Sequence, residues 1–506
     1  MSRSSRGTCA VGVAVLLTLT SCGTRASDSL RQQAAAAALG SGGGTGTGTS
    51  GGTTGDGSTG SGSTTAGTTG STTAGTTSGG STSGSGSTSG GSSTSGAGST
   101  SGAGATGGTS AGGTSAAAPA PAGGNGGATD VGVTDTAITV ANVSDVGGPR
   151  PGLFAGAPVG TAAYFNMINS QGGIYGRKIN VLSLDSQLDC GQNTDKTTSA
   201  LNKAFAYVGS FSLYDDCGAD VLKKHLDIPD VHAALGLSAQ KLPTNFPIAP
   251  LGNGWRTGPL NYYKAKYGAK WGHIGAIYAN VGTGPSIWKG VVAAVNNSGG
   301  HFDREEPYGA TDTDFTGAVV RMQSAGVQMI YVNTTDGPTG AALVRAIKSQ
   351  NLDWPIIFGA TAYAPDFLSN LTNAQSEGIL NDQQFAQFFN PDEAQVTPSV
   401  GLFQKWMALT NKKQQLDIFA AYGWAEAQLF TQALKAAGPK ATRASLLTAL
   451  RKIKTFDADG MFAPANPADH VPATCWLLNT IKGGKFVRID PAKGYRCDGT
   501  YFRQGS

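Results

Sequence analysis

The chain has 506 residues, of which 13% are charged and 39% are hydrophobic, and its formal net charge at pH 7 is +4. This length exceeds what one hydrophobic core usually supports, so more than one folded unit is expected. The positive charges form no basic stripe, which excludes the electrostatic surface that nucleic-acid binding requires.

The first residues have the pattern of an export signal. Arg3 and Arg6 precede an apolar run over residues 10–19, which is too short to span a bilayer. The tetrapeptide Leu-Thr-Ser-Cys that ends at Cys22 resembles the bacterial lipobox, in which the signal is cut before a cysteine that then receives lipid. An ordinary cleavage site beside a chance cysteine is the alternative. We expect a signal peptide over residues 1–21 and, because two or three acyl chains hold firmly, a stable anchor on the outer face of the cell membrane.

A long segment of small residues follows the cysteine. From about residue 40 to residue 128 the chain is almost wholly Gly, Ser, Thr and Ala, without the periodic apolar residues that could offset the entropy of ordering. We therefore predict a disordered linker within residues 22–128, with an r.m.s. reach of about 50 Å for roughly 90 residues. The segment also matches hydrolase and dinucleotide-loop motifs. These matches do not lie between a strand and a helix, so we attribute them to low complexity.

Export also determines how the six cysteines are interpreted, because disulfides persist outside the cytoplasm. Cys9 leaves with the signal and Cys22 carries the lipid. Four remain and allow three pairings: Cys190, Cys217, Cys475 and Cys497. We favour the two pairs that are local in sequence, Cys190 with Cys217 and Cys475 with Cys497, because the chain between the second and third cysteines must build most of a domain. A metal site is the weak alternative, since no Cys-x-x-Cys occurs and the histidines are scattered.

From residue 129 the composition becomes that of an ordinary globular protein, in which expected strands and helices alternate. Apolar residues at Val159, Ala163 and Met167 lie on one row of the first helix, and Gly172 and Gly173 end it. Such alternation predicts a parallel sheet with helices on both faces, here a first lobe over residues 129–251. The expected strands are 138–142, 179–184, 207–209 and 228–232, and the expected helices are 159–169, 196–205 and 220–226.

A second alternating series predicts a second lobe over residues 252–380. Its expected strands are 273–278, 329–332 and 355–359, and its expected helices are 286–296 and 339–350. Two long helices, 416–437 and 443–453, then return within residues 381–455 to pack on the first lobe. Residues 456–506 are expected to cross the hinge and to carry the second disulfide. The predicted fold class is α/β, with two doubly wound parallel-sheet lobes joined by a hinge.

Two local motifs point to a family. The segment Asn-Ser-Gln-Gly-Gly-Ile-Tyr-Gly-Arg-Lys-Ile over residues 169–179 resembles a helix-end and strand-start signature, and Thr-Asp-Phe-Thr over 313–316, before a helix at 317–324, resembles a second-lobe segment. In these features, and in their order, the chain from about residue 135 to 485 resembles the leucine/isoleucine/valine-binding proteins, type I solute-binding components of ABC importers. The pair Cys190–Cys217 also has a counterpart in that family.

The resemblance implies the type I periplasmic-binding-protein fold, a two-lobe clamp that closes on a ligand. The hinges would lie near residues 251–257, near 378–385, and within 456–475. The physics of open α/β sheets agrees, because such sheets bind ligands beyond the carboxyl ends of their strands. Closure would shift the conformational population in a way that a permease can sense.

Carried over position by position, the family pocket predicts ligand-binding residues in the first lobe. Phe154 occupies the loop in which the family has an aromatic wall. Ser210 and Ser212 follow the third strand, where the family offers hydroxyl and N–H groups to a carboxylate, although these serines could instead cap the next helix. Ala233 and Ala234 match two family alanines, but the next residue is a leucine, so the family's threonine hydroxyl is missing.

The second lobe departs further from the family. The acidic partner of the ligand ammonium falls at Thr361, and a neutral threonine cannot neutralise a buried ammonium. Asp336 could substitute for it, or could be a solvated loop carboxylate. Thr283 and Tyr363 are further pocket candidates, with turn or packing roles as the alternatives.

The expected function is capture of a small molecule, a branched-chain amino acid or a related amino acid or amide-like solute, for an ABC permease in the same membrane. We expect a monomer with no cofactor, no metal and no catalytic residue. A ligand-sensing surface receptor without transport is the alternative, and an enzyme is the remote one, since the globule has no His-Glu-x-x-His, Walker loop or nucleophile elbow. His232 and His273, beside strands, are interpreted as surface or satisfied core residues.

Overall fold

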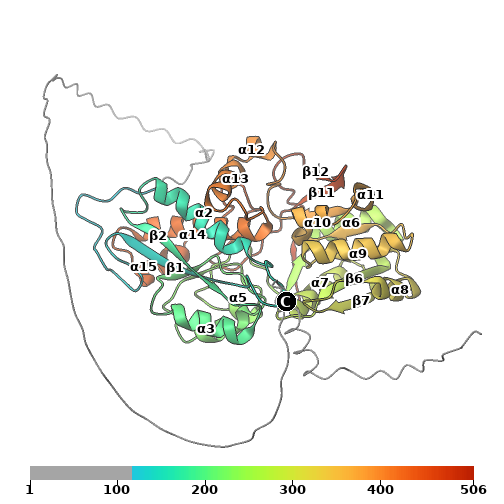
Figure 1. Cartoon of the computed structure of the whole chain (residues 1–506), viewed down its shortest axis with the longest axis horizontal. Helices are drawn as coiled ribbons and strands as arrows, with labels where there is room; N and C mark the ends of the chain where they lie inside the picture. Colours follow the sequence, from blue (N-terminus) through green and yellow to red (C-terminus); the bar gives the residue numbers. More distant parts are fainter. Residues whose placement is uncertain (1–116, 506) are drawn as a thin grey trace, which may run out of the picture. The chain divides into compact units, whose positions relative to one another are not determined.

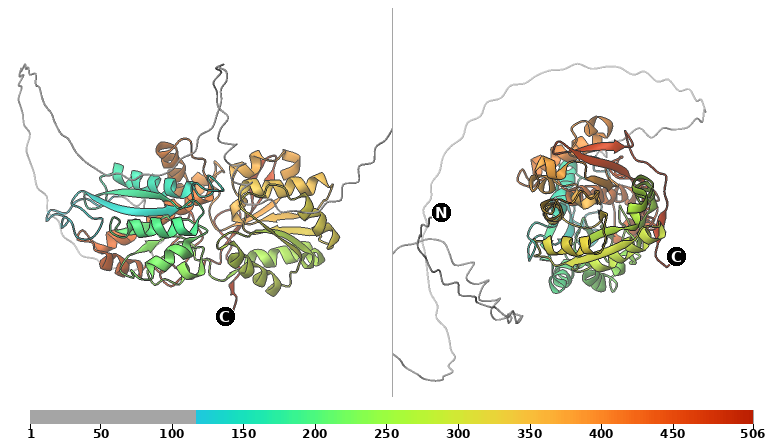
Figure 2. Two further views of the ribbon diagram at one scale, coloured as in Figure 1. Left: turned by 60° about the horizontal axis from the view of Figure 1, so that its bottom comes forward. Right: turned by 90° about the vertical axis from the view of Figure 1, so that its right-hand side faces the viewer.

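Two large β-sheets organise residues 117–505, the part of the chain that a computed structural model describes (Figure 1). The expected signal peptide, Cys22 and most of the expected linker lie outside the described residues. The two lobes built on these sheets stand next to each other in the left view of Figure 2. Among residues 117–505, no helix is both long and apolar enough to cross a membrane.

The sheet of lobe 1 has four parallel strands in the order β2-β1-β3-β4. Successive side chains of β1 point to opposite faces: Val140 packs in one apolar cluster, and Ala141 and Val143 pack in another. Both faces are therefore covered by helices, as the alternation predicts. The strands are β1 (Ala137–Ser144), β2 (Lys178–Asp185), β3 (Ala206–Val208) and β4 (Asp230–Val231), and the intervening helices are α2 (Gly156–Ser170), α3 (Cys190–Ala200), α4 (Asp215–Leu222) and α5 (Leu237–Gln240).

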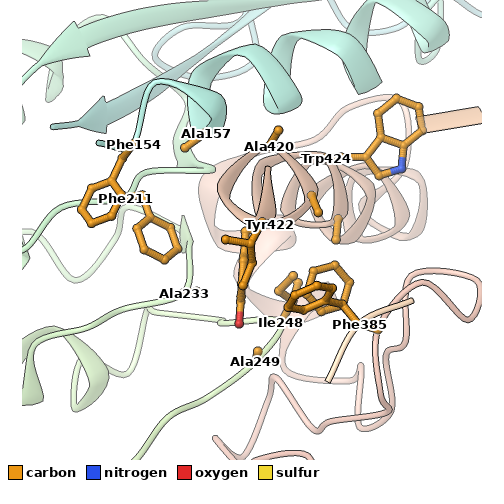
Figure 3. Packing of buried hydrophobic residues seen from close by; sticks show 14 of the residues in the cluster. Phe154, Ala157, Phe211, Ala233, Ile248, Ala249, Phe385, Ala420, Tyr422 and Trp424 are labelled. Atoms are coloured by element: carbon orange, nitrogen blue, oxygen red, sulfur yellow. The ribbon is translucent and has the colours of Figure 1, made fainter. Parts of the chain in front are cut away.

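Later segments of the chain complete lobe 1. Helix α14 lies directly against α2, and glycines allow the close approach (Figure 3). A Cβ atom added at Gly160 would lie 1.9 Å from the carbonyl oxygen of Ala420, and one at Gly423 would lie 2.2 Å from that of Ala157. The helices of this later part of the chain are α12 (Glu393–Val396), α13 (Pro398–Thr410), α14 (Ile418–Ala437) and α15 (Arg443–Leu450).

The sheet of lobe 2 has seven strands in the order β12-β11-β10-β9-β8-β6-β7. Strands β6 to β10 pair in parallel, and β11 and β12 add an antiparallel hairpin at one edge, which turns at Gly483 and Gly484, both with positive φ. The strands are β6 (Ile274–Ala279), β7 (Phe302–Tyr308), β8 (Met329–Val332), β9 (Ile356–Phe358), β10 (Leu380–Gln383), β11 (Leu477–Lys482) and β12 (Lys485–Asp490).

The helices of lobe 2 lie on the two faces of its sheet. A short ribbon of β5 (Gly254–Arg256) and β13 (Tyr501–Arg503) pairs the start of the lobe with the end of the chain. The helices are α6 (Thr257–Tyr267), α7 (Gly284–Asn297), α8 (Thr316–Ser324), α9 (Gly337–Ser349), α10 (Pro365–Ser369) and α11 (Asn373–Ser376).

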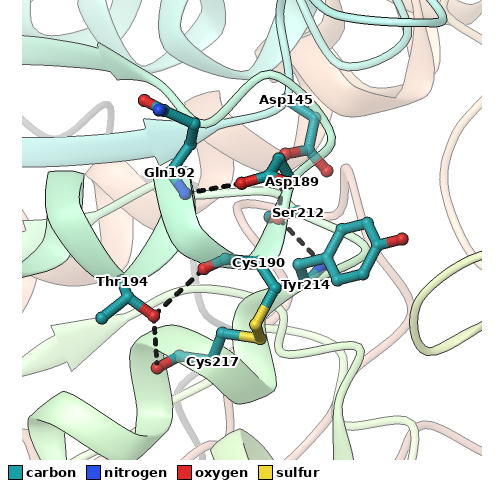
Figure 4. The surroundings of a disulfide bond; sticks show 8 residues. All are labelled: Asp145, Asp189, Cys190, Gln192, Thr194, Ser212, Tyr214 and Cys217. Carbon is teal, nitrogen blue, oxygen red and sulfur yellow. Dashed lines mark hydrogen bonds between the residues drawn. A yellow bond between two sulfur atoms is a disulfide. The ribbon is translucent and has the colours of Figure 1, made fainter. Parts of the chain in front are cut away.

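Both expected disulfides are present, and Figure 4 shows the one between Cys190 and Cys217. Cys190, the first residue of α3, is bonded to Cys217 in α4, with 5.6 Å between their Cα atoms. Cys475, just before β11, is bonded to Cys497. The choice of sequence-local pairs is therefore confirmed.

Several expected boundaries are wrong. The helix expected over 196–205 is α3, which begins at Cys190 because the Asp189 carboxylate caps it, accepting the N–H of Gln192 at 2.8 Å. The helix expected over 220–226 is α4, which begins five residues earlier, at Asp215. Helix α6 and strands β7, β10, β11 and β12 were not predicted, since β7 is rich in charge and the others lack clear periodicity.

The expected linker also ends earlier than its composition suggests. Residues from 117 on pack against lobe 1, because the buried Arg177 guanidinium donates to the carbonyl oxygens of Asn125 and Gly127, each at 2.7 Å. The Asn125 amide in turn donates to the carbonyl oxygen of Tyr175 at 3.1 Å. Backbone hydrogen bonding, which composition does not report, orders this stretch.

Candidate functional site

A cavity lies between the two lobes, at the carboxyl ends of the parallel strands. The cavity has a volume of about 160 Å³, which is room for on the order of ten waters. Its lining is mainly apolar, and both lobes and the first crossing between them contribute to it. The larger apolar lining residues are Leu153, Phe154, Leu188, Phe211, Leu213, Leu235, Leu251, Trp255, Val281, Ile287, Tyr308, Ile418, Phe419 and Tyr422.

Four aromatic rings form the lobe 1 wall of this cavity. Phe154 follows β1 and Phe211 follows β3, whereas Phe419 and Tyr422 come from the first turns of α14. The Phe154 ring centroid lies 4.9 Å from that of Phe211 and 4.6 Å from that of Phe419, and Phe211 lies 5.5 Å from Tyr422, all edge to face. Figure 3 shows Phe154, Phe211 and Tyr422. Mutual packing fixes these rings, so the wall is preformed.

The lobes touch each other at two places beside the cavity. The Arg150 guanidinium of lobe 1 pairs with the Asp336 carboxylate of lobe 2 and donates to the Thr339 hydroxyl at 3.0 Å. The backbone N–H of Thr283 in lobe 2 donates to the carbonyl oxygen of Leu213 in lobe 1 at 2.8 Å. Arg150 and Asp336 also line an adjoining outer hollow, so their ion pair lies between that hollow and the cavity.

A buried polar network lies where the chain crosses between the lobes. Arg256 at the end of β5 donates to Asp382 Oδ1 at 3.1 Å and to Gln384 Oε1 at 3.0 Å, and Tyr263 donates to Asp382 Oδ2 at 3.1 Å. Gln384 then donates to the hydroxyl of Tyr422 in the cavity wall at 2.9 Å. Burial raises the pKa of Asp382, and the Arg256 charge opposes that rise.

Three of the predicted ligand-binding residues line the cavity: Phe154, Asp336 and Thr361. Asp336 is engaged twice, by Arg150 and by the N-terminus of α9, where it accepts the N–H of Thr339 at 2.9 Å. The Thr361 hydroxyl accepts the N–H of Thr335 at 3.2 Å. Asp336 is therefore partly exposed, but its carboxylate is already engaged by other groups of the protein.

The other predicted residues lie outside the cavity lining, although they are buried. The Ser210 hydroxyl accepts the N–H of Val143 at 3.0 Å, and the Ser212 hydroxyl donates to Asp145 and accepts the N–H of Tyr214, each at 3.0 Å. Both serines thus stabilise loops of lobe 1.

The remaining four predicted residues are likewise set back from the cavity. The N–H of Ala233 donates to Glu426 at 2.5 Å, and Ala234 packs in the cluster between the lobe 1 sheet and helices α3 and α4. Thr283 contributes the backbone contact between the lobes. Tyr363 is fully buried among phenylalanines, and its hydroxyl accepts the N–H of Phe389 at 3.0 Å.

Sequence reasoning missed much of the lining, including Arg150, Phe211, Trp255, Arg256, Phe419 and Tyr422. The sequence held a usable signal for Phe211, which stands between the two predicted serines after a strand. The signal for Phe419 and Tyr422 was weaker. Only their place at the start of a helix, at the end that faces the cleft, distinguishes them from other aromatic residues.

His232 is a buried and hydrogen-bonded core residue, one of the two roles that the sequence predicted for it. Its Nδ1 lies 2.6 Å from Asp230, and its Nε2 lies 3.7 Å from Asp215. Burial alone would lower the pKa of His232, but the two carboxylates raise it well above the usual value. His273 is about half exposed and pairs with Asp303 at 2.9 Å. Within residues 117–505, no group of three His, Cys, Asp or Glu side chains is placed to hold a metal ion.

Comparison with known proteins gives the family. The family model described as "Periplasmic binding protein" matches residues 137–485, which is more than half of the chain. The chain belongs to the periplasmic binding protein family. The resemblance to leucine- and branched-chain amino-acid-binding proteins of ABC transporters, and their type I fold, are thereby confirmed. A search of curated proteins gave no significant match.

Solved structures share the fold of this periplasmic binding protein. A fatty acid ABC transporter substrate-binding protein from Thermomonospora curvata is 21% identical, with a TM-score of 0.61 over 77% of this chain and 97% of that one. A branched-chain amino acid transporter substrate-binding protein from Streptococcus pneumoniae, in complex with isoleucine, is 19% identical, with a TM-score of 0.57 over 70% and 100%. An ABC transporter solute-binding protein from R. palustris, in complex with benzoate, is 18% identical, with a TM-score of 0.58 over 73% and 98%.

The outer hollow of this binding protein has an acidic group at the start of α14. Asp417 caps that helix, accepting the N–H of Ala420 at 2.6 Å, and it accepts the amide of Gln414 at 3.1 Å. Burial, together with the nearby Asp366 carboxylate, raises the pKa of Asp417 to about 7. The folded protein therefore holds a proton on Asp417 over a pH range in which the unfolded chain has released it.

We predict that the contribution of Asp417 to stability falls as the pH rises from about 4 to about 7, because the folded state holds more protons on this carboxyl than the unfolded state does in this window. Asp417→Asn keeps a capping oxygen but does not titrate, so it should reduce the slope of unfolding free energy against pH by up to about 1.4 kcal/mol per pH unit. Urea unfolding at several pH values measures this slope. Asp189→Asn, which makes the same change at the exposed cap of α3, is the matched control for the loss of a capping carboxylate. Equal slopes in the wild type and Asp417→Asn would contradict the assignment.

Proposed function

We propose that this protein captures a small molecule with an apolar body between its lobes and delivers it to an ABC permease in the same membrane. The observation that carries the proposal is the cavity between the lobes, with rings of Phe154, Phe211 and Phe419 on one side and residues of lobe 2 on the other. A ligand there would contact both lobes at once. Capture then requires no chemistry on the ligand, only contacts that favour the closed arrangement.

The family supports the transport part of the proposal, because its members are solute-binding proteins of ABC transporters. The names of the related structures mention isoleucine, a fatty acid and benzoate, which share an apolar body. A branched-chain amino acid or an amide-like solute is the ligand class that the sequence resemblance suggests for this chain. Burying a branched or aromatic body against the phenylalanine wall would contribute about 25 cal/mol for each Å² of apolar surface removed from water.

Membrane tethering completes the proposal. A lipid on Cys22 would hold the signal-cleaved protein at the outer face of the membrane, and the segment rich in Gly, Ser and Thr would let the lobes move around that anchor. We propose that the protein acts as a monomer, since each chain contributes the whole cavity lining.

The cavity assignment predicts that Phe419→Ala lowers ligand affinity. A thermal-shift screen of amino acids, amides, organic acids and aromatics would identify the compound, which should stabilise the fold by about 2.7 kcal/mol at a hundred times its Kd. Loss of the Phe419 ring should then weaken that compound about tenfold or more in calorimetry, because apolar contact area is removed. Phe389→Ala, an equally half-buried phenylalanine outside the cavity, is the control and should leave the Kd unchanged. Equal affinities for the two variants would place the ligand elsewhere.

The lipid anchor is tested with two serine variants. Cys22→Ser should abolish incorporation of labelled palmitate and release the protein from the membrane fraction, because the acceptor thiol is removed. Cys9→Ser changes a cysteine inside the expected signal peptide and should alter neither property. Membrane retention and labelling of Cys22→Ser at the wild-type level would refute the anchor.

A further inference from the structure

The charged side chains that line the cavity are already paired with other protein groups. Among the described residues, the charged members of the lining are Arg150, Arg256 and Asp336. Arg150 pairs with Asp336, and Arg256 pairs with Asp382, which is fully buried behind it. The two guanidinium charges are balanced by two carboxylates, so the site presents no uncompensated charge to a ligand.

Each ion pair is further held by neutral groups. Asp336 accepts the N–H and the hydroxyl of Thr339, each at 2.9 Å, while Arg150 also donates to that hydroxyl. Asp382 accepts the Tyr263 hydroxyl, and Gln384 accepts from Arg256. A charged ligand would enter without a counter-ion, or would break a pair and leave one member buried and unpaired. The second outcome is strongly unfavourable for a buried pair.

Four buried polar atoms of lining residues lack a hydrogen-bond partner, namely Trp255 Nε1, Arg256 Nε, Asn333 Oδ1 and Thr334 Oγ1. Asn333 and Arg256 are the most deeply buried of these residues. Asn333, which follows β8, and Arg256, in β5, are each 98% buried, since only 2% of either residue is exposed. Asn333 Oδ1 and Arg256 Nε nevertheless have no partner in the protein. An unmade hydrogen bond at a buried polar group is unfavourable, so these atoms are expected to find a partner in the occupied site.

The two atoms are complementary to one kind of chemical group. The N–H at Arg256 Nε donates to an oxygen, and Asn333 Oδ1 accepts an N–H or O–H. A carboxamide or a hydroxyl carries both a donor and an acceptor, as these two atoms require, whereas a carboxylate can only accept and an ammonium can only donate. Because Asp382 already balances Arg256, the oxygen that meets Nε needs no negative charge.

We propose that the ligand is an uncharged molecule with an apolar body and one carboxamide or hydroxyl group, held by Asn333 and by Nε of Arg256. This inference rests on the proposed function, because it concerns the same cavity. It separates this protein from one that takes a free amino acid: the zwitterion carries two charges, and the candidate partners for them, Asp336 and the two serines, are bound to other groups of the protein.

The test compares charged and neutral compounds that share one skeleton. Benzamide, benzyl alcohol, benzoate and benzylamine form one series, and isovaleramide, isoamyl alcohol, isovalerate and isoamylamine form another. Calorimetry with the purified protein at pH 7.5 should give the amide or the alcohol of at least one series a Kd at least tenfold lower than those of the acid and the amine. Benzoate or any other charged member binding as tightly as its neutral counterpart, or isoleucine binding as tightly as the best amide or alcohol, would overturn the proposal.

The same experiment separates the two proposals. If charged compounds bind best, the neutral-ligand assignment fails and capture between the lobes stands. If nothing in these series or in the wider thermal-shift screen binds, both proposals fail.

A charge introduced at Asn333 gives the matched variant. Asn333→Asp is close to isosteric, and it should weaken the amide at least tenfold and shift the preference toward the amine, because it adds an unbalanced carboxylate to the cavity. Asn297→Asp makes the same change at an exposed position at the end of α7 and should alter no affinity. Asn333→Ser, which keeps a neutral polar group, should lower the amide affinity less and guards against a folding defect, which thermal unfolding of each free variant detects. Equal preference in Asn333→Asp and Asn297→Asp would overturn the role of Asn333.

Discussion

A buried ion pair at the junction of the lobes is the interaction on which the cavity depends. Arg256 is 2% exposed and its partner Asp382 is 0% exposed, so each charge relies on the other for compensation. Removing either partner would leave an uncompensated buried charge, which costs about 3–5 kcal/mol. The pair joins two segments that cross between the lobes, the first at Arg256 and the second at Asp382. Gln384 extends it to Tyr422 in the cavity wall, and the carbonyl oxygen of Gln384 accepts the N–H of Ala463 in the third crossing at 2.7 Å.

Rigid walls follow from this junction and from the packing of lobe 1. Trp255, which lines the cavity, lies under the Arg256 guanidinium at 4.7 Å from its ring centroid, so the ion pair also positions an aromatic wall residue. On the opposite side, glycines bring α14 against α2 and fix the start of α14, from which Phe419 and Tyr422 enter the cavity. A ligand therefore meets surfaces that are already in place, which reduces the entropy lost on binding.

Much of the fold was predictable from sequence, because hydrophobic periodicity and glycine stops are local signals. Strands β1, β2, β6 and β8 and helices α2 and α14 were predicted to within a few residues. The positions of the cysteines also predicted their pairing. Local signals failed where a tertiary contact decided the outcome, as at residues 117–128, which the buried Arg177 orders.

The site was less predictable, because its residues come from segments far apart in the chain and their roles depend on orientation. Ser210 and Ser212 follow the expected strand, but their hydroxyls bind groups of lobe 1. Arg150 and Asp336 are 186 residues apart, and no sequence pattern links them. Phe154 could be predicted since it occupies a loop that the family uses for an aromatic wall.

The central claim, that a solute is held between the lobes, is tested most directly by a crystal structure of the protein with the compound that gives the largest thermal shift. Our account predicts electron density for that compound in the cavity, in contact with Phe154 and Phe419 of lobe 1 and with Asn333 of lobe 2. Density at any other place on the protein, with this cavity filled by water alone, would contradict it.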